Sequence, residues 1–524
     1  MLTVSKHEGA TVPPLFADLS KIILGDVDCS HLAIKAHSTD GSPYSVRPQA
    51  ILYPKTTGDI KHAIAFAREY QIPLTVSGGQ TSASGGALSE GILLDLTRYF
   101  SHTRTMNAME HTVIVDAGVR IDDLKEKLAS WNMEIPVLQD EHGDATVGGL
   151  VATKSATAST FYAGTIREWI EGVTIVVDTG EEHHLKDGIS PSGRLLGIYQ
   201  SVFPLLSASG PTLRAARREC SDDATGYSLW NVSIGPRQLI DNLVGSEGTL
   251  AVITSVTFRV VQKKKHTLTL LLPVSDFTKI ETYVDIAKHH RAHRLFIFDE
   301  TFRTLTDTFH TGLLQKTLPR SPFTLVISLQ GDDLPLLTKE IKTLSSALLG
   351  KEEVELLDER TASKIMSNSF LTSLFHTYSK GLHMIATAGN GIIVPMRSYN
   401  ECAQALTAHM GLTGKLFTLT GFVGSGHIAI TTAFDSQSTA YEKELQSYRE
   451  NLFHIVETWK GGISAVGGDG LERTAALSHV YNEATREIFK KVKEAWDPLS
   501  IFNPSKKIHI SKDYLIQHAV RSLE

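Results

Sequence analysis

PLTVSGGQTSASGGALSEGILLDL, residues 73–96, is the first of two glycine-rich stretches in this chain, and GDATVGGLVATKSATASTFYAGTIREWIEGVTIVVDTGE, residues 143–181, is the second. The glycines at the centre of these stretches are Gly78, Gly79, Gly85 and Gly86 in the first and Gly148 and Gly149 in the second. Glycine lets the backbone come close to a ligand and turn its N–H groups toward an anion. Two such loops together predict binding of a diphosphate.

The pattern of the two loops disfavours the commonest nucleotide-binding motifs. Neither loop reads GxGxxG between a strand and a helix, and neither reads GxxxxGK followed by Ser or Thr. Glycines after a strand also make simple tight turns, so one such loop alone would leave the choice open. The pair of loops favours a ligand site outside the Rossmann and P-loop classes.

Length and composition indicate a globular protein of two or three domains. The chain has 524 residues, of which 42% are hydrophobic and 21% charged, and its 51 basic and 57 acidic residues give a net charge of -6. This mild acidity indicates no nucleic-acid partner. We expect no nucleic-acid-binding function.

The cysteines and the first residues of the chain indicate the cellular compartment. Cys29, Cys220 and Cys402 form neither a CxxC pair nor the four-thiolate set of an iron–sulfur cluster. The first residues lack a secretory signal, and no apolar run is long enough to span a membrane. We expect a cytoplasmic protein, and peripheral membrane contact stays open.

The first half alternates helical and strand-like patterns. Apolar residues at helical spacing after Asp59, a candidate N-cap, predict a helix over residues 59–70. A strand over 112–118 precedes a second helix, and GVTIVVDTGEEHHL is typical of a hairpin. The pattern predicts an α+β or mixed α/β domain.

The second half has a different pattern of predicted strands and helices. After the basic run 263–265, which we interpret as a solvated linker at a domain boundary, strand-like segments at 268–274 and 323–332 flank helical ones. They predict an antiparallel sheet covered by helices. A final helix from Leu477 to before Pro498 is expected to present Val480, Ala484, Ile488 and Val492 on one face.

Seven segments, in order along the chain, carry a resemblance to a known family: VRPQAILYPKTTGDI, VSGGQTSASGG, TVGGLVATKSA, YAGTIREWIEGV, DDATGYSL, LVGSEGTLAVIT and WDPLSIFNPSKKI. With them the chain resembles the flavoproteins that have the vanillyl-alcohol-oxidase (PCMH-type) FAD domain. Within that family it is most similar to the branch of D-lactate dehydrogenases, the glycolate oxidase flavin subunit and D-2-hydroxyglutarate dehydrogenase.

The resemblance implies an α+β fold in which two subdomains hold FAD and a C-terminal cap with an antiparallel sheet covers the flavin ring. We expect an N-terminal segment (1–45), the FAD domain (46–262), the cap (266–480) and a C-terminal helix and tail returning to the FAD domain (481–524). By resemblance, Ser77, Gly78, Gly79, Gln80, Thr81 and Ser82 wrap the diphosphate. Val147, Gly148, Gly149, Gly164 and Thr165 line the ribityl and flavin portion, Glu247, Gly248 and Ile253 lie near the adenine, and Asn503 lies near the ring.

Some relatives tether the flavin to a histidine in the first loop. This loop reads SGGQTS, which predicts non-covalent FAD. His102 and His142 are the alternative tethers, and ordinary surface or turn positions are the favoured interpretation for both.

The cap departs from the family pattern. Relatives carry GHxGDGNLH and a later Glu-His pair that bind a metal and the substrate, whereas here Phe422, Ala429, Val466 and Gly467 occupy the matching positions. A divalent metal needs several convergent His or carboxylate ligands, so we predict no metal. The arginine that clamps the substrate carboxylate in relatives also has no clear counterpart, which puts a 2-hydroxy acid substrate in doubt.

His427 and Arg397 are the catalytic candidates, with His376, Tyr378 and Glu472 as looser ones. Dehydrogenation of an alcohol by flavin needs hydride delivery to N5 and a base for the hydroxyl proton, and histidine has a suitable pKa. His427 is the candidate base, with a hydrogen-bonded structural role as the alternative. Arg397 is a candidate carboxylate ligand, with an exposed helix-start position as the favoured interpretation.

Three functions remain open. The leading one is an FAD-dependent dehydrogenase or oxidase that takes a hydride from a small hydroxylated substrate, such as a 2-hydroxy acid. Its acceptor would be external: oxygen, a quinone, an electron-transfer protein or an iron–sulfur partner. The alternatives are oxidation of a sugar, lactone or other alcohol on the same fold, and a catalytically degenerate flavin-binding protein.

Overall fold

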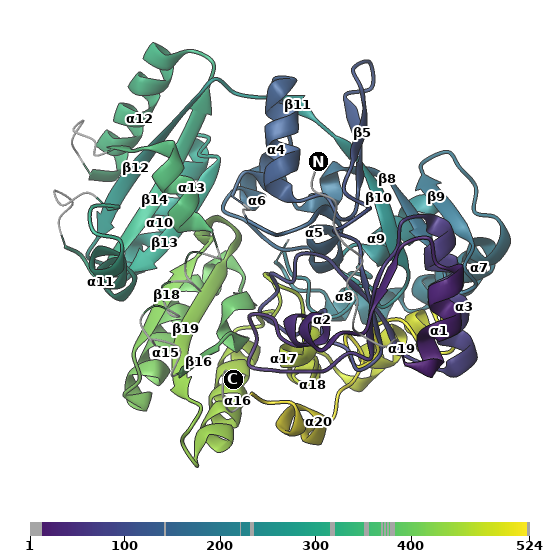
Figure 1. Ribbon diagram of the computed structural model, residues 1–524. Coiled ribbons are helices and arrows are strands. Elements are labelled where there is room, and N and C mark those ends of the chain that lie inside the picture. The colour runs from purple at the N-terminus through teal and green to yellow at the C-terminus, as the bar shows by residue number, and fades with distance from the viewer. Residues whose placement is uncertain are drawn as a thin grey trace.

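The structure is a computed structural model that describes residues 13–140, 143–220, 222–230, 235–314, 320–349, 356–367, 370, 374, 377 and 383–520. Two sheet-containing halves lie side by side (Figure 1). The first half is built from the N-terminal part of the chain, and the second, in green, from residues after His266. The C-terminal segment, in yellow, runs back beneath the first half.

A four-stranded sheet carries the first glycine loop. Its strands, in order, are β1 (Asp26–Asp28), β2 (Ala50–Tyr53), β4 (Ile92–Asp95) and β3 (Leu74–Ser77). β3 and β2 both run parallel to β4, and β1 is antiparallel to β2. Helices α1 (Pro14–Ile22) and α3 (Thr57–Tyr70) pack their apolar residues against this sheet, whereas α2 (His31–Ala36) follows β1. The glycine loop begins where β3 ends.

A five-stranded antiparallel sheet completes the first half. Its strands, in order, are β5 (Thr103–Asn107), β6 (Thr112–Asp116), β10 (Val252–Arg259), β8 (Ile170–Val176) and β9 (Glu182–Lys186). β8 and β9 are the expected hairpin. The connecting helices are α4 (Ile121–Ser130), α5 (Val147–Thr153), α6 (Thr160–Ala163), α7 (Gly193–Ala208), α8 (Gly210–Ala216) and α9 (Pro236–Leu243). β7 (Met133–Glu134) and β11 (Val261–Gln262) form a small separate pair.

The second half contains the expected antiparallel sheet. Its strands, in order, are β15 (Leu356–Leu357), β12 (His266–Val274), β14 (Phe323–Gly331), β13 (Arg294–Asp299), β18 (Phe417–Gly421), β19 (His427–Asp435) and β16 (His383–Ala386), and β17 (Ile392–Ile393) pairs with β19. Its helices are α10 (Ile280–His289), α11 (Glu300–Phe309), α12 (Leu334–Leu349), α13 (Glu359–Met366), α15 (Tyr399–Thr413) and α16 (Tyr441–Thr458). The α+β class and the two-part architecture are thus confirmed.

The two faces of this sheet bury different partners. Leu295 and Ile297 face a core shared with α10, α12, α15 and α16. Their neighbours Phe296 and Phe298 point to the opposite face and pack with α11, α13 and residues from both halves, including Ala156 and Val466. Alternation along the strand therefore turns one face of the sheet toward the first half.

The C-terminal segment differs from its prediction. The expected single helix is divided into α18 (Leu477–Val480) and α19 (Glu483–Trp496), because the Asn482 side chain accepts a hydrogen bond from the backbone N–H of Thr485 and caps a new helix. Ala484 is exposed, whereas Ile488 and Val492 pack into the core of the first half. α17 (Gly470–Thr474) precedes these helices and α20 (Lys512–Gln517) follows them.

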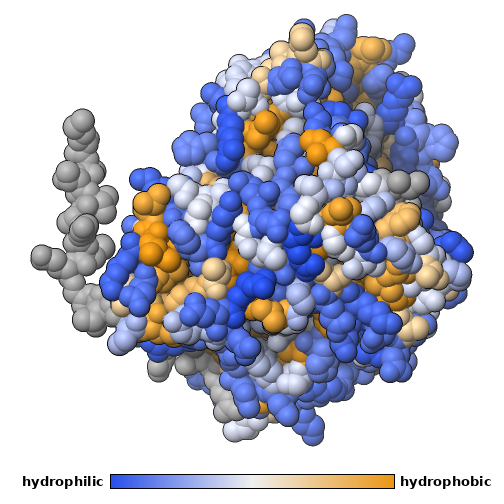
Figure 2. Space-filling model, turned by 90° about the vertical axis from the view of Figure 1, so that its right-hand side faces the viewer, coloured by the Kyte–Doolittle hydropathy of each residue, from blue (hydrophilic) through white to orange (hydrophobic). Residues whose placement is uncertain are grey.

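In the described part of the chain, no helix is both long and apolar enough to cross a bilayer. On the side shown in Figure 2, apolar residues lie in small groups among polar ones, as on ordinary protein surfaces. Lysines 263–265 are exposed between β11 and β12.

Asp59 is a buried carboxylate that organises the start of α3. Thr56 is the N-cap of this helix, and Asp59, three residues later, completes a capping box, so Asp59 is not itself the cap. Its carboxylate also accepts hydrogen bonds from the backbone N–H groups of Leu24 at 2.8 Å, Gly25 at 3.1 Å and Lys55 at 2.7 Å. One side chain therefore ties the segment of Leu24 and Gly25 to the start of α3.

We expect Asp59→Ala to lower the free energy of unfolding by roughly 2–4 kcal/mol, because several buried N–H groups would lose their acceptor. Urea unfolding measures the change. Asp123→Ala, which removes an exposed carboxylate from the first turn of α4, is the matched control and should cost less than about 0.5 kcal/mol. Equal losses in the two variants would contradict this role.

Candidate functional site

A cavity of about 650 Å³ lies between the two halves. The first half contributes both glycine loops, the turn that contains Glu247 and Gly248, and Ile253 at the start of β10. The second half and the C-terminal segment contribute Ser367, Asn390, Ala429, Val466, Gly467 and Arg473. A ligand that fills the cavity would touch both parts of the molecule.

The first glycine loop offers a row of free donors to this cavity. Ser77, Gly78, Gly79, Gln80, Thr81 and Ser82 all line it. Among the described residues, the backbone N–H groups of residues 78–82 have no hydrogen-bond acceptor. The Nε2 atom of Gln80, whose backbone is left-handed with a φ of 50°, is buried and also has no partner in the described residues. Such donors suit an anion, as the sequence predicted.

Packing between the two loops also requires glycine in the first loop, which the sequence did not reveal. A Cβ added to Gly79 would lie 1.6 Å from the carbonyl oxygen of Asp144, and one added to Gly78 would lie 2.2 Å from Oγ1 of Thr146. The two loops thus pack backbone against backbone. Gly86 also lines the cavity, but a Cβ there would meet nothing closer than 3.6 Å.

The second loop enters the cavity as the first turn of α5. Thr146 caps this helix by accepting a hydrogen bond from the backbone N–H of Gly149 at 3.3 Å, and Gly148 and Gly149 both line the cavity. The remaining residues assigned to this portion lie elsewhere. Val147 packs into the core of the first half, and Gly164 and Thr165 contact Glu168 outside the cavity lining.

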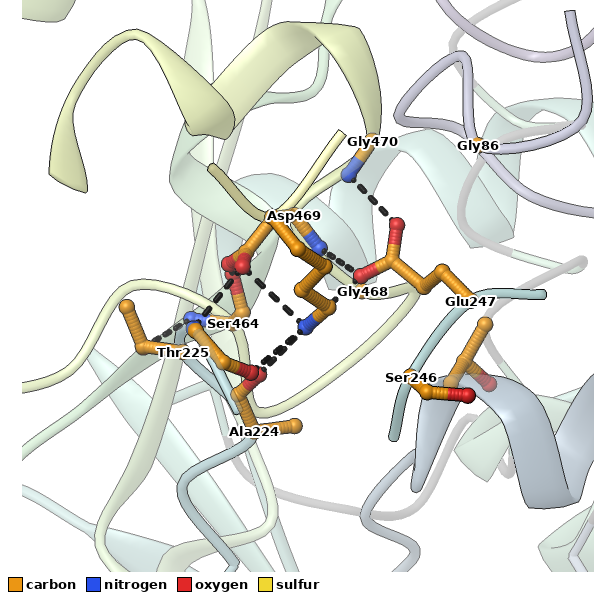
Figure 3. Close-up of polar contacts among 12 residues, drawn as sticks. Gly86, Ala224, Thr225, Ser246, Glu247, Ser464, Gly468, Asp469 and Gly470 are labelled. Atoms are coloured by element: carbon orange, nitrogen blue, oxygen red, sulfur yellow. Dashed lines mark hydrogen bonds and ion pairs between the residues drawn. The ribbon is translucent and has the colours of Figure 1, made fainter. Parts of the chain in front are cut away.

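Glu247 clamps the C-terminal segment to the first half (Figure 3). Its carboxylate accepts hydrogen bonds from the backbone N–H groups of Asp469 at 2.6 Å and Gly470 at 2.8 Å. It also lies 2.8 Å from Nζ of Lys507, which is fully buried and 3.1 Å from the carboxylate of Asp469. Both carboxylates raise the pKa of Lys507, which keeps it charged.

Asn503 connects this clamp to the first loop. Its amide donates hydrogen bonds to the carbonyl oxygens of Gly86 at 2.9 Å and Glu247 at 2.7 Å. The side chain is buried and lies outside the cavity lining. It therefore positions two lining segments.

His427 is buried behind the cavity wall and does not line it. Its Nδ1 accepts a hydrogen bond from the backbone N–H of Phe422 at 3.2 Å, and its Nε2 donates to the carbonyl of Asn390 at 2.8 Å. Burial lowers the pKa of His427 to about 4. With both nitrogens occupied, this geometry supports the structural role and gives no support to the catalytic one.

Two of the other catalytic candidates, Arg397 and Glu472, do not line the cavity. Arg397 is exposed and ion-paired with Glu219, which agrees with the exposed helix-start interpretation. Glu472 forms a bidentate ion pair with Arg449. His376 and Tyr378 lie outside the described residues.

The described lining contains no His or Cys, so His102, one of the two alternative tethers, does not line the cavity. The side chain of His102 is 74% exposed and 3.5 Å from Asp116. His142 lies outside the described residues.

The positions that hold metal ligands in the family pattern form an apolar wall here. Ala429, Val466 and Gly467 line the cavity, and Phe422 lies behind them against Phe296, with 6.0 Å between ring centroids. Among the described residues, no three His, Cys, Asp or Glu side chains converge on one point.

Comparison with protein families assigns both halves. The model described as "FAD binding domain" matches residues 48–186, and the model described as "FAD linked oxidases, C-terminal domain" matches residues 263–507. The chain belongs to the FAD-linked oxidases. It is therefore an FAD-dependent oxidoreductase, and the resemblance found in the sequence is confirmed.

Individual relatives of this FAD-linked oxidase are distant. A D-lactate dehydrogenase of Anaerostipes hadrus is 24% identical over 472 residues, which cover 88% of this chain and 89% of the relative. A D-2-hydroxyglutarate dehydrogenase of Escherichia coli (strain K12) is 23% identical over 525 residues, 92% of this chain but 50% of the relative, so the chain spans about half of that protein. Among solved structures, 4-ethylphenol oxidase from Gulosibacter chungangensis shares the fold, with a TM-score of 0.66 at 14% identity over 95% of this chain and 97% of that one.

The cavity of this FAD-linked oxidase fits the cofactor. In the described part of the chain, the N–H groups of residues 78–82 and the buried Nε2 of Gln80 have no acceptor, and such donors suit a diphosphate. Gly148 and Gly149 also line this side, together with Glu247, Gly248, Ala251 and Ile253. Sequence reasoning missed Ser155, which lies in the second glycine-rich stretch, and Arg473 and Asn390, which reach the cavity only because distant segments meet there.

We expect Gly79→Ala to lose FAD and to unfold more readily, because its Cβ would collide with the Asp144 carbonyl. Gly86→Ala is the matched control within the same loop. It should fold normally, and any weakening of FAD binding in it would then report contact with the cofactor. The checks are the flavin absorbance of the purified protein and its thermal midpoint. A Gly79→Ala protein that retains full FAD would contradict the loop-packing argument.

His427 should make stability fall in mild acid. Its folded pKa of about 4 lies below the ordinary value near 6.5, so the unfolded chain takes up a proton that the folded chain refuses. Its contribution to the free energy of unfolding is complete above pH 6.5 and declines as the pH falls toward 4, by at most about 3 kcal/mol.

The measurement is urea unfolding of the wild type and His427→Gln at several pH values between these limits. Glutamine can still donate to the Asn390 carbonyl but does not titrate, so the difference between the two proteins isolates the histidine. Parallel stability curves would refute the assignment. Turnover of His427→Gln tests the catalytic alternative, which predicts an inactive enzyme.

Proposed function

We propose that this FAD-linked oxidase removes a hydride from the C–OH carbon of a small 2-hydroxy acid and passes the electrons to an external acceptor. The observation that carries the proposal is the cavity, in which a diphosphate-type glycine loop and residues of the second half form opposite walls. The named relatives, D-lactate and D-2-hydroxyglutarate dehydrogenases, act on acids of this class.

The chain's own residues would divide the work. Residues 77–82, with Gly148 and Gly149, would hold FAD without a covalent bond. When bound, FAD supplies the hydride acceptor at flavin N5. Ala429 and Val466 would exclude water from the reacting end of the cavity, and the clamp between Glu247 and Gly470 would keep these walls in register.

The electron acceptor would be separate from this chain. Three scattered cysteines cannot supply an all-cysteine iron–sulfur cluster, so oxygen, a quinone, an electron-transfer protein or an iron–sulfur partner would reoxidise the flavin. We infer a cytoplasmic location, with peripheral membrane contact as the alternative.

A second candidate is oxidation of a sugar, lactone or other alcohol. It is favoured by the apolar wall of Ala429 and Val466, which stands where the family pattern has metal and substrate ligands. Such a wall avoids the cost of desolvating a charged carboxylate, although each hydroxyl of a neutral substrate buried there would still need a hydrogen-bond partner.

The first experiment is a visible spectrum of the purified protein and of the supernatant after acid precipitation. We expect a flavin spectrum that moves entirely to the supernatant. D-lactate, D-2-hydroxyglutarate, their L-enantiomers, sugars and benzyl alcohol are then added anaerobically. Bleaching by a D-2-hydroxy acid is the expected outcome, with the L-enantiomers as matched controls. Bleaching only by neutral alcohols or sugars would favour the second candidate, and no bleaching by any compound would contradict both.

A further inference from the structure

Arg473 is a buried cation in the cavity wall that the family assignment does not explain. It lies in the short helix α17, is 1% exposed and lines the cavity together with Asn390, Val466 and Gly467. A Cβ added to Gly391 would lie 2.8 Å from its Nη1, which places the guanidinium beside the segment that carries Asn390. The charge therefore lies on the side of the cavity that the second half forms.

Backbone carbonyls bind only part of this guanidinium. Nη1 donates to the carbonyl oxygens of Val466 and Gly468, both at 2.6 Å, and Nη2 donates to that of Thr387 at 3.1 Å. Nε is buried and has no acceptor among the described residues. One N–H of Nη2 and the N–H of Nε thus remain, and these two nitrogens form the edge that binds a carboxylate side-on.

The neighbouring carboxylates already have partners of their own. Glu472 is held by Arg449 at 2.7 and 2.8 Å, and Glu247 and Asp469 share Lys507. Within the described part of the chain, Arg473 forms no ion pair with a carboxylate. Burial lowers the pKa of its guanidinium, as expected for a desolvated charge. The nearby charges of Glu472, Asp469 and Glu247 act against this lowering, but none of them is within ion-pair distance of the guanidinium among the described residues. The buried N–H of Nε has no acceptor there, so an anionic ligand that accepts from it would stabilise this site.

The rest of the lining limits what that anion carries. Arg473 is the one cationic residue among the described lining residues, and Ala429 and Val466 beside it are apolar. Among the described lining residues, a second carboxylate on the ligand would find no second cation. The wall thus matches a single carboxylate attached to a small apolar group.

We propose that Arg473 binds the carboxylate of a small 2-hydroxy monocarboxylic acid side-on and so selects anionic substrates over neutral alcohols. This inference rests on the proposed function and names its substrate class. The Nε–Nη2 edge of Arg473 would also suit a second anion, the negatively charged pyrimidine ring of the reduced flavin. The test therefore separates a substrate anion from a cofactor anion.

The probe is 2-hydroxyisobutyrate, which has no hydrogen on C2 and is not oxidised, paired with its neutral isostere 2-hydroxyisobutyramide. Each is titrated into the FAD-loaded protein, and binding is followed by the flavin absorbance and by equilibrium dialysis. The wild type should bind the acid at least about tenfold more tightly than the amide. Arg473→Gln should weaken acid binding about tenfold to a hundredfold and remove the preference, and Arg473→Lys should retain part of it.

Arg218→Gln is the matched control. Its guanidinium also donates to backbone carbonyls, those of Gly461 and Val480, but it does not line the cavity. It should leave both affinities unchanged. FAD content and the unfolding midpoint of every variant show whether a loss of binding reflects a loss of structure.

Two results would overturn the inference. One is wild-type protein that binds the acid and the amide alike or binds neither. The other is an Arg473→Gln protein that keeps the preference for the acid while its flavin midpoint potential falls, which would assign Arg473 to the cofactor. A protein that binds the acid through Arg473 but is reduced by no hydroxy acid would keep this inference and lose the proposed function. If hydroxy acids bleach the flavin of the wild type and of Arg473→Gln equally well, the proposed function would stand and this inference would fail.

Discussion

The buried interaction between Glu247, Lys507 and the backbone of Asp469 and Gly470 holds the site together. It joins a turn of the first half to the loop that leads into α17 and to the C-terminal tail (Figure 3). Ionised side chains are tolerated at such depth only when paired and hydrogen-bonded, so this arrangement has few alternatives. The position of the loop in turn places Val466 and Gly467 in the cavity wall.

Two other constraints act on the same cavity. The glycine loops approach so closely that side chains at 78 and 79 would collide with residues of the second loop, so the row of free N–H groups is a product of backbone packing as well as of ligand binding. On the opposite wall, alternation along β13 directs Phe296 and Phe298 toward the first half. The polar glycine loops and a mostly apolar wall therefore line opposite sides of the same cavity.

Local patterns in the sequence predicted much of the fold, because periodicity and turn residues act over a few positions. The helix expected over 59–70, which begins two residues earlier with Thr56 as its cap, the hairpin of β8 and β9 and the antiparallel second sheet are all present, and the family motifs led to FAD. The final helix was wrong at its start, where Asn482 caps a new helix that periodicity alone does not distinguish. The catalytic role of His427 was inferred from its place in a motif, and motif position carries no information about the Phe422 and Asn390 backbone groups that occupy its nitrogens.

The sequence by itself determined the α+β class, the two glycine loops and the loss of the metal-ligand pattern in the second half. Only the tertiary structure decided which residues share the cavity: Asn390, Val466 and Arg473 are brought beside loops that lie hundreds of positions earlier in the chain. The physical reason is that hydrogen-bond and ion-pair partners are set by distances in the folded chain, which the order of residues in the sequence does not give. In the sequence Arg473 is an ordinary arginine beside a glutamate, and only the structure shows that Glu472 pairs with Arg449 and that no described carboxylate contacts Arg473 directly.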